Sequence, residues 1–477
     1  MPRPIPLLLA LLFVLGFQQE APAPDRLSEA LDRIIEGEYA RSAFWGIYIQ
    51  DVDSGRILYR LNEDKTLLPA SNQKLLTTAT ALDVLGSAYR YQTTLYLNGE
   101  IEEGVLRGDL IIEGSGDPTF GSRRYRQDDP LQRWAAALAE QGVTRIEGRI
   151  IGDDDVFDEE RYGEGWDVTH VATQDYAPAR SGLSYHDNLI NVELEATTTG
   201  RPPTVDASPP GYFTVLNQAV TGARSRGARP LLERPVGAET IRIHGTVPRA
   251  YRRTFTLPVS DPTAFTLHLF AARLLEAGID VAAPLVDVDD LAEKPTYGAA
   301  ETLFVHASPP LSEIIAIINK QSDNLYAEQV FHTFGWGGSS AGGEARVKET
   351  LARLGIPTGG LSVRDGSGLS RKDLVTPQAM GLLLTRMYAH AEGAAFRASL
   401  AEGGERGTTL RFRLQGRPVM GKTGSLEYVR ALSGYVVTPD ARTLAFVLLA
   451  NNYTAPTYRI EQAIDLIVQT LTSTPVG

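Results

Sequence analysis

The feature that most constrains this fold is a long β-rich middle enclosed by strand-like segments at the two ends of the chain. Residues 44–64 (FWGIYIQDVDSGRILYRLNED) predict two strands around the turn DVDSG. Residues 417–453 predict three more strands, the last two joined at TPDAR, with a helix following to Leu471. We expect the early hairpin to pair with the late strands. The two chain ends would then form one antiparallel sheet flanked by helices, and the middle would be an insertion.

The chain of 477 residues is too long for one ordinary core, so two or three domains are expected. The middle has short alternating runs and two amphipathic helices, which predict a β-rich domain. Its Pro-, Gly- and Arg-rich part predicts a further small β module. The resulting class is α+β and multidomain. The expected division is 1–24 (leader), 25–91 and 301–477 (two parts of the first domain), 92–191 and 255–300 (two parts of a second domain), and 192–254 (a third domain).

Composition excludes several classes of function. The net charge of −12 supplies no basic surplus for phosphate contacts, so we expect no nucleic-acid partner. With no cysteine, the chain has no disulfide, no zinc–thiolate site and no cysteine nucleophile. The seven histidines are scattered without an HExxH pair, and we expect neither a metal nor a cofactor.

The N-terminus resembles an export signal. Arg3 precedes an apolar run from Ile5 to Phe17, which is short for a membrane span and is followed by a Pro- and Ala-rich segment. The cleavage site is unclear, and a retained anchor with peripheral membrane association is the alternative. Either way the protein is expected to be exported and to work in the periplasm or cell envelope.

Three short motifs suggest chemistry. They are Ser71-x-x-Lys74 at the start of a predicted helix to Leu85, Ser322-Asp323-Asn324 in a break between two predicted helices, and Lys422-Thr423-Gly424 on a predicted strand. Each motif alone is weak evidence for chemistry; a serine at a helix start, for example, is usually only an N-cap. All three in this order match the signature of serine acyl-transfer enzymes.

The residue types suit that chemistry. The Ser71 hydroxyl needs a nearby base, and Lys74 serves only when it is neutral. Burial and a second cation favour the neutral form, and Lys422 is the candidate for that cation. Ser322 is expected to pass a proton to the leaving amine. Asn324 is expected to hold the substrate amide and Lys74.

Further residues are expected to bind the substrate. The backbone N–H groups of Ser71 and Ser425 are candidate donors to the tetrahedral oxyanion. Gly424 is expected to let a substrate backbone lie close to its strand. A substrate carboxylate is expected to meet Lys422, Thr423 and Arg371, the last from the segment DGSGLSR, whose glycines a tight turn explains equally well.

With these motifs, the chain resembles the D-alanyl-D-alanine carboxypeptidase/endopeptidase family, the class C low-molecular-mass penicillin-binding proteins (serine peptidase family S13). Segments such as GSGDPTF, SGLSYHDN and GKTGSLEYVRALSGY carry the likeness over the whole mature chain. Ser71 and Ser322 are 322 − 71 = 251 residues apart, far more than in class A β-lactamases.

The resemblance implies a β-lactamase/transpeptidase-like catalytic domain interrupted by the inserted domains. It also implies hydrolysis of D-Ala-D-Ala ends and of peptidoglycan crosslinks, and acylation by β-lactams. It places Asp323 among the substrate-binding residues. It further implies an aromatic pocket for the stem peptide, for which Trp166 and Tyr176 are candidates, with Asp167 or Asp175 for an amine; ordinary core packing of Trp166 is the alternative.

Two other functions stay open at this point. A serine β-lactamase would need a water-activating group, and the sequence offers no recognisable one. A penicillin-binding wall sensor would keep the cleft and deacylate slowly. The GxSxG pattern at 338–342 lacks a preceding strand and is expected to be a loop, and the acidic run 153–160 is expected to be solvated. The oligomeric state is not predicted.

Overall fold

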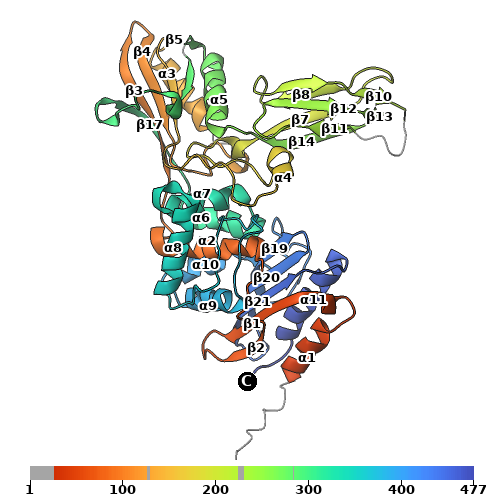
Figure 1. The fold of residues 1–477 in the computed structure, drawn as a ribbon. Coiled ribbons are helices and arrows are strands. Elements are labelled where there is room, and N and C mark those ends of the chain that lie inside the picture. The colour runs from red at the N-terminus through yellow and green to blue at the C-terminus, as the bar shows by residue number, and fades with distance from the viewer. Residues whose placement is uncertain (1–25, 126–128, 224–229, 283) are drawn as a thin grey trace, which may run out of the picture.

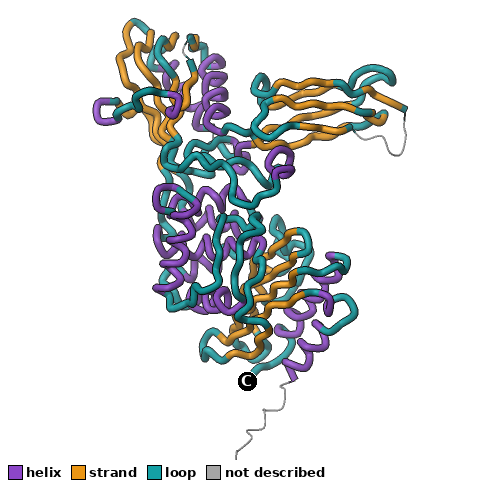
Figure 2. Tube along the Cα trace, in the orientation of Figure 1, coloured by secondary structure: helices purple, strands orange, loops and turns teal. Residues whose placement is uncertain are grey.

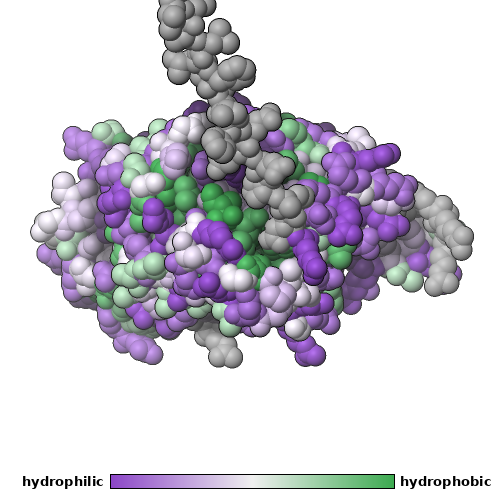
Figure 3. Space-filling model, turned by 90° about the horizontal axis from the view of Figure 1, so that it is seen from below, coloured by the Kyte–Doolittle hydropathy of each residue, from purple (hydrophilic) through white to green (hydrophobic). Residues whose placement is uncertain are grey.

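The computed structural model describes residues 26–477 except 126–128, 224–229 and 283. The molecule is elongated, with one sheet at the end that holds the C-terminus, a helical layer next to it, a second sheet at the far end and a β-rich arm (Figure 1). Seen from the C-terminal end, hydrophilic residues cover most of the surface around a smaller apolar area (Figure 3). The predicted leader 1–24 lies outside the described residues, and no helix in the described ranges is long and apolar enough to span a membrane.

The first sheet is built from both ends of the chain. β1 (Phe44–Asp51) pairs antiparallel with β21 (Thr443–Asn451) along its whole length. The strand order is β18-β19-β20-β21-β1-β2. The remaining members are β2 (Ile57–Leu61), β18 (Ala401–Glu402), β19 (Val419–Leu426) and β20 (Val429–Val437). The predicted sheet formed from both chain ends is therefore confirmed.

Helices cover both faces of this sheet because its central strands are apolar on both. In β21, Leu444 and Phe446 pack in one core, and Ala445 and Val447 pack in another, as the two-residue period of a strand requires. The first core joins the sheet to α1 (Arg26–Ile35), which the sequence analysis missed, and to α11 (Thr457–Leu471). The second core joins it to the helical layer (Figure 2): α2 (Gln73–Leu85), α6 (Leu311–Ala316), α7 (Asn324–Phe334), α8 (Ser340–Arg353), α9 (Pro377–Tyr388) and α10 (Gly393–Ala398).

The second sheet belongs to the middle of the chain. Two helices pack on it, α3 (Pro130–Glu140) and α5 (Pro262–Glu276), and each begins with an aspartate N-cap followed by proline. Its strands are β3 (Gln92–Glu102), β4 (Val105–Glu113), β5 (Arg145–Ile146), β6 (Ile150–Asp153), β15 (Asp280–Val281), β16 (Leu285–Asp287) and β17 (Glu301–Ala307).

The β-rich arm holds three small sheets (Figure 1). A short helix, α4 (Val168–Thr173), lies between the arm and the helical layer. The arm strands are β7 (Leu189–Glu195), β8 (Thr204–Ser208) and β14 (Arg252–Pro258); β9 (Thr214–Asn217), β11 (Leu231–Glu233) and β12 (Thr240–His244); and β10 (Val220–Gly222) with β13 (Thr246–Pro248).

Some predicted boundaries need correction. Positions 192 and 254 fall inside β7 and β14, so we propose that the arm runs from 189 to 258. β17 pairs with β3, so residues 301–307 belong to the second sheet and not to the C-terminal part of the first domain. The loop expected at 338–342 is also wrong in part, because α8 begins at Ser340, with Ser339 as its N-cap.

Candidate active site

Ser71 lines a large cavity and lies in a tight 3₁₀ turn (Ala70–Asn72) that runs into α2. The helix was predicted to begin at Ser71, whereas its α-helical part begins at Gln73. The Ser71 Oγ and the Lys74 Nζ are 3.2 Å apart. Ala70 has a φ of +47°, a strained conformation for a residue with a side chain. The nucleophile candidate therefore sits on a bent, closely packed turn.

The surroundings of Lys74 fit a neutral amine. Its side chain is fully buried, and Nζ donates to the Asn324 Oδ1 at 2.5 Å and to the Ser367 carbonyl at 2.6 Å. Both of those oxygens only accept hydrogen bonds, so a neutral Lys74 amine uses its two N–H groups to donate to them. Its lone pair is then free to accept a hydrogen bond from the Ser71 hydroxyl, and this contact is the longest of the three. This is the arrangement that a general base requires.

The Ser322-Asp323-Asn324 segment links a π-helical turn (Ile317–Gln321) to α7. Ser322 has a φ of +63°, and its Oγ accepts a hydrogen bond from the Lys422 Nζ at 2.9 Å. Asn324 holds Lys74 with its oxygen and donates through Nδ2 to the Tyr176 carbonyl at 2.7 Å. It therefore ties the base to the inserted segment.

The placement of Asp323 corrects its predicted substrate contact. Its Oδ1 caps α7 by accepting the Tyr326 N–H, and its other oxygen pairs with Arg124. Asp323 is not among the described residues that line the cavity. The geometry makes it a positioning residue, because it holds the turn that carries Ser322.

β19 presents alternate residues to the cavity. Thr423 and Ser425 line the cavity, whereas Lys422 and Gly424, which alternate with them along the strand, are buried. The Lys422 Nζ donates to the Ser322 Oγ and to the Thr423 carbonyl.

Gly424 has a packing role besides the one predicted for it. A Cβ at this position would lie 2.8 Å from the Pro69 carbonyl oxygen and 3.3 Å from the Ala70 Cβ. The glycine therefore lets the strand pack against the turn that carries Ser71. Its predicted contact with a substrate backbone stays a prediction.

Burial lowers the pKa of both lysines. For Lys74 the value falls to about 8, because desolvation outweighs the opposing charges of Asp365 and Glu328. For Lys422 the pKa lies well below its usual range, through burial first and the neighbouring Lys74 second. The acidic neighbours Asp365 and Glu328 act on Lys74, and the role of Lys422 as the neighbouring cation stays a prediction.

Two buried carboxylates that the sequence analysis missed organise this region. The Glu328 Oε1 accepts the N–H groups of Gly366 and Ser367, and the Ser367 carbonyl holds Lys74. Burial raises the pKa of Glu328 to about 8. Glu328 follows Asn324 by four residues in α7, so helical spacing is the signal that places both on one face.

The second carboxylate, Asp365, begins the DGSGLSR turn. It accepts the N–H groups of Gly368 and Ser370 and the indole N–H of Trp166 at 2.8 Å. Gly368 has a φ of +81°, and a Cβ there would lie 1.9 Å from the Ala70 carbonyl oxygen. The turn is thus shaped to pack against the segment that carries Ser71.

The cavity has a volume of about 800 Å³, and it brings together most of the predicted residues. Trp166, Asp167, Tyr176 and Arg371 line it, whereas Asp175 is not among its described lining residues. Trp166 is only partly buried, so the alternative of plain core packing does not account for it. The cavity lining comprises Ser71, Gly165, Trp166, Asp167, His170, Tyr176, Ala177, Ser322, Asn324, Leu369, Arg371, Thr409, Thr423, Ser425, Leu426, Glu427, Tyr428, Arg430, Tyr453, Ala455 and Thr457.

Arg371 lies at the far end of β19 from Lys422. Its Nη1 donates to the Glu427 carbonyl at 3.2 Å. Glu427 directly follows β19 and stands five positions after Lys422. The contact of Arg371 with the substrate carboxylate stays a prediction. Arg371 lines the cavity together with Trp166 and Tyr176.

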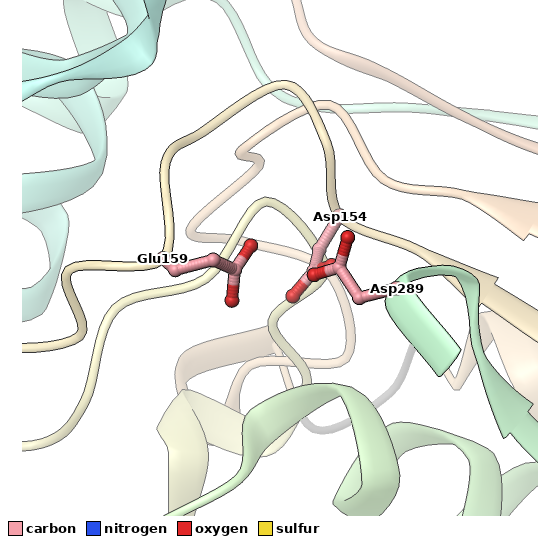
Figure 4. Close-up of side chains that lie close together, drawn as sticks. All are labelled: Asp154, Glu159 and Asp289. Atoms are coloured by element: carbon pink, nitrogen blue, oxygen red, sulfur yellow. The ribbon is translucent and has the colours of Figure 1, made fainter. Parts of the chain in front are cut away.

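One acidic cluster outside the cavity has the composition of a metal site. Oxygens of Asp154, Glu159 and Asp289 lie within 4.8 Å of one another (Figure 4). Asp154 is buried, which corrects the prediction of a fully solvated acidic run. Its Oδ2 accepts from the hydroxyls of Ser181 and Thr263, and Asp289 pairs with Lys294 at 3.0 Å. Hydroxyl and ammonium donors thus bind two of the three carboxylates.

Comparisons with known proteins identify relatives of this chain. The D-alanyl-D-alanine carboxypeptidase of an Actinomadura species is 33% identical over 449 residues, covering 90% of this chain and 82% of the relative. The carboxypeptidase DacB of Haemophilus influenzae is 26% identical, covering 86% and 85%. The crystal structure of penicillin binding protein 4 (dacB) from Haemophilus influenzae has the same fold, with a TM-score of 0.81, 23% identity and coverage of 92% and 98%. The profile of the D-Ala-D-Ala carboxypeptidase 3 (S13) family matches residues 27–471, and the chain therefore belongs to this family.

Proposed function

We propose that this protein is a serine D-alanyl-D-alanine carboxypeptidase and DD-endopeptidase that acts on the stem peptides of peptidoglycan and is acylated by β-lactams. One observation carries the proposal. A fully buried lysine with a lowered pKa contacts the hydroxyl of a serine that lines a large cavity, and a second buried lysine contacts a second serine beside it. Family membership and the carboxypeptidase relatives support it.

Acylation begins when neutral Lys74 takes the Ser71 proton as the Ser71 Oγ attacks the carbonyl carbon of the penultimate D-alanine. The backbone N–H groups of Ser71 and Ser425 bind the oxyanion that forms. The carbon–nitrogen bond then breaks, and the leaving amine receives a proton through Ser322. Water hydrolyses the acyl-enzyme, which releases the shortened peptide and restores the Ser71 hydroxyl.

The remaining residues position the substrate. Lys422 and Thr423 bind the carboxylate of the leaving residue, and Asn324 holds the amide on the acyl side. Trp166, Tyr176 and Arg371, with Asp167, line the part of the cavity that takes the stem-peptide side chain. No cofactor takes part in this scheme. Such a substrate, together with the export signal predicted at the N-terminus, would place the protein in the periplasm or cell envelope.

The test joins two measurements on the purified protein. We expect release of D-alanine from a D-Ala-D-Ala-terminated peptide over many turnovers, and a single penicilloyl adduct located on Ser71 by mass spectrometry. Ser71→Ala is expected to lose both. Rapid turnover of a chromogenic cephalosporin without peptide cleavage would instead indicate a β-lactamase. Stoichiometric acylation without peptide turnover would indicate a slow-deacylating sensor.

A further inference from the structure

A second cavity adjoins the active-site cavity at β19, and we call it the β19 groove. It has a volume of about 730 Å³ and shares Thr409, Thr423 and Ser425 with the first cavity. Its remaining lining comes from Arg124, from the turn before Ser322, from Gly424 in β19, from α11 and from the segment 403–418 between β18 and β19. The groove is lined by Arg124, Gln321, Gly407, Thr408, Thr409, Arg411, Phe412, Arg413, Thr423, Gly424, Ser425 and Glu461.

The position of the groove determines which half of a substrate reaches it. In the proposed reaction the carboxylate at Lys422 and Thr423 belongs to the leaving residue. The stem on the acyl side then runs toward Arg371 and Trp166, at the other end of β19. The groove, which begins at Thr423 and includes Gln321, lies on the leaving side.

The chemistry of the leaving group differs between the two candidate substrates. From a D-Ala-D-Ala end, the leaving residue has a carboxylate and only a methyl side chain. From a crosslink, the leaving residue has the same kind of carboxylate, but its side chain continues into a second stem peptide that carries further carboxylates. A cavity of this size beyond the carboxylate site is not needed for a methyl group, whereas a second peptide needs such space.

The charges in the groove suit an anionic peptide. Arg413 is neutralised by Asp465, Arg124 by Asp323, and Glu461 by Arg430. Arg411 is different, because no acidic side chain in the described ranges forms an ion pair with it. This leaves one exposed, uncompensated guanidinium at the groove.

An exposed aromatic ring accompanies this charge. Phe412 is 78% exposed, and the Arg411 guanidinium lies 4.7 Å from its ring centre. An exposed aromatic ring next to a cation is typical of a surface that binds a partner. The ring offers apolar contact to the aliphatic part of a peptide strand.

The segment that carries these two residues is held firmly next to the active site. The Thr409 N–H donates to the Lys320 carbonyl at 3.0 Å, and Lys320 pairs with Glu405 at 2.7 Å. Leu410 and Leu414 anchor the segment in the core under the first sheet. Arg411 and Phe412 are therefore presented at a fixed position relative to Ser322.

We propose that the β19 groove binds the leaving strand of crosslinked peptidoglycan, with Arg411 and Phe412 as residues that determine specificity for crosslinks over free D-Ala-D-Ala ends. This inference rests on the proposed function, because it takes the direction of the substrate from the carboxylate contact at Lys422.

The experiment measures the ratio of kcat/KM for a purified crosslinked muropeptide dimer to kcat/KM for a D-Ala-D-Ala-terminated pentapeptide. Exposed charge contacts and exposed rings contribute modestly, so the double variant Arg411→Ala/Phe412→Ala is expected to lower this ratio about tenfold. Arg411→Lys keeps the charge and is expected to retain most of the ratio. Arg406→Ala is the matched control: it removes an exposed arginine of the same segment that does not line the groove, and the ratio should stay at the parental value.

The outcomes separate this inference from the proposed function. If the parent protein neither releases D-alanine nor takes up penicillin, the proposed function fails. If it does both and cleaves the dimer, but the ratio is unchanged in the double variant, the inference alone is overturned. If the crosslinked dimer is not cleaved at all, the inference and the endopeptidase part of the proposed function both fail, while the carboxypeptidase part stands. A fall in the ratio that Arg406→Ala reproduces equally would also overturn it. Penicillin acylation rates of all variants confirm that each is folded.

Discussion

Adding one methyl group at Gly424 tests how the active site is assembled. In the structure, β19 lies so close to the turn before Ser71 that position 424 has no room for a side chain. A Cβ would lie 2.8 Å from the Pro69 carbonyl oxygen, 3.0 Å from the Ala431 Cβ and 3.3 Å from the Ala70 Cβ. Two of these three neighbours directly precede the nucleophile.

The size of the effect follows from these contacts. The methyl group requires a shift of about half an ångström between β19 and the turn, and such overpacking costs about 1–3 kcal/mol of unfolding free energy. The same shift displaces Ser71 from Lys74 and from the Ser425 N–H. Because a displacement of about 1 Å can lower a rate about 100-fold, Gly424→Ala is expected to slow acylation by about 10-fold or more.

Labelled-penicillin uptake gives the acylation rate constant, and thermal unfolding gives the stability. Gly359→Ala is the control, because nothing lies within 4 Å of the position of its Cβ. Both quantities should fall in Gly424→Ala and neither in Gly359→Ala. Slower acylation with unchanged stability would refute the packing argument and favour the alternative that Gly424 makes room for the substrate. If both the acylation rate constant and the stability stay at their parental values, neither the packing role nor the substrate role of Gly424 holds.

Three further predictions concern the residues around the base. Lys74 acts as the neutral amine and its pKa is about 8, so about a tenth of the protein has a neutral Lys74 at pH 7. The acylation rate constant should therefore rise with pH up to about 8 and then level off. A flat profile from pH 6 to 9 would contradict this role of Lys74. Asn324→Ala removes one of the three hydrogen-bond partners of the Lys74 Nζ and also the donor to the Tyr176 carbonyl, so it should lower stability by about 2–4 kcal/mol in urea unfolding and slow acylation. Loss of rate alone would show that the contact to Tyr176 is unimportant for the fold. Trp166→Phe keeps an aromatic ring but removes the indole N–H that donates to the buried Asp365, so it should lower the free energy of unfolding by about 1–3 kcal/mol. A larger loss of stability in Tyr162→Phe than in Trp166→Phe would argue against a stabilising role of this hydrogen bond.

Much of the fold could be predicted because its signals are local. β1 and β21 have strand-like apolar patterns, and the Asp-Pro pairs that start α3 and α5 are helix caps readable from two residues. The arm boundaries were missed by a few residues because no local change marks the ends of β7 and β14. The assignment of β17 was wrong because pairing with β3 is a contact between distant segments.

The motif residues were predictable for a similar reason: a serine hydroxyl, a lysine amine and an asparagine amide have their chemistry wherever they lie. Their charge states were not predictable, because these depend on which groups lose water together. Glu328 and Asp365 came to light only in the fold, where their charges oppose the desolvation that lowers the pKa of Lys74.

By itself, the sequence determined which reactive groups the protein has, where most of its strands and helices lie, and that both ends of the chain form one sheet. Only the tertiary structure decided that Asp323 positions α7, that Gly424 makes room for the turn before Ser71, and that Arg371 contacts the Glu427 carbonyl just beyond β19. Lys74 meets Asn324 across 250 residues of chain and Lys422 meets Ser322 across 100. Hydrogen bonds and desolvation between such distant residues depend on packing, which no local pattern of residues encodes.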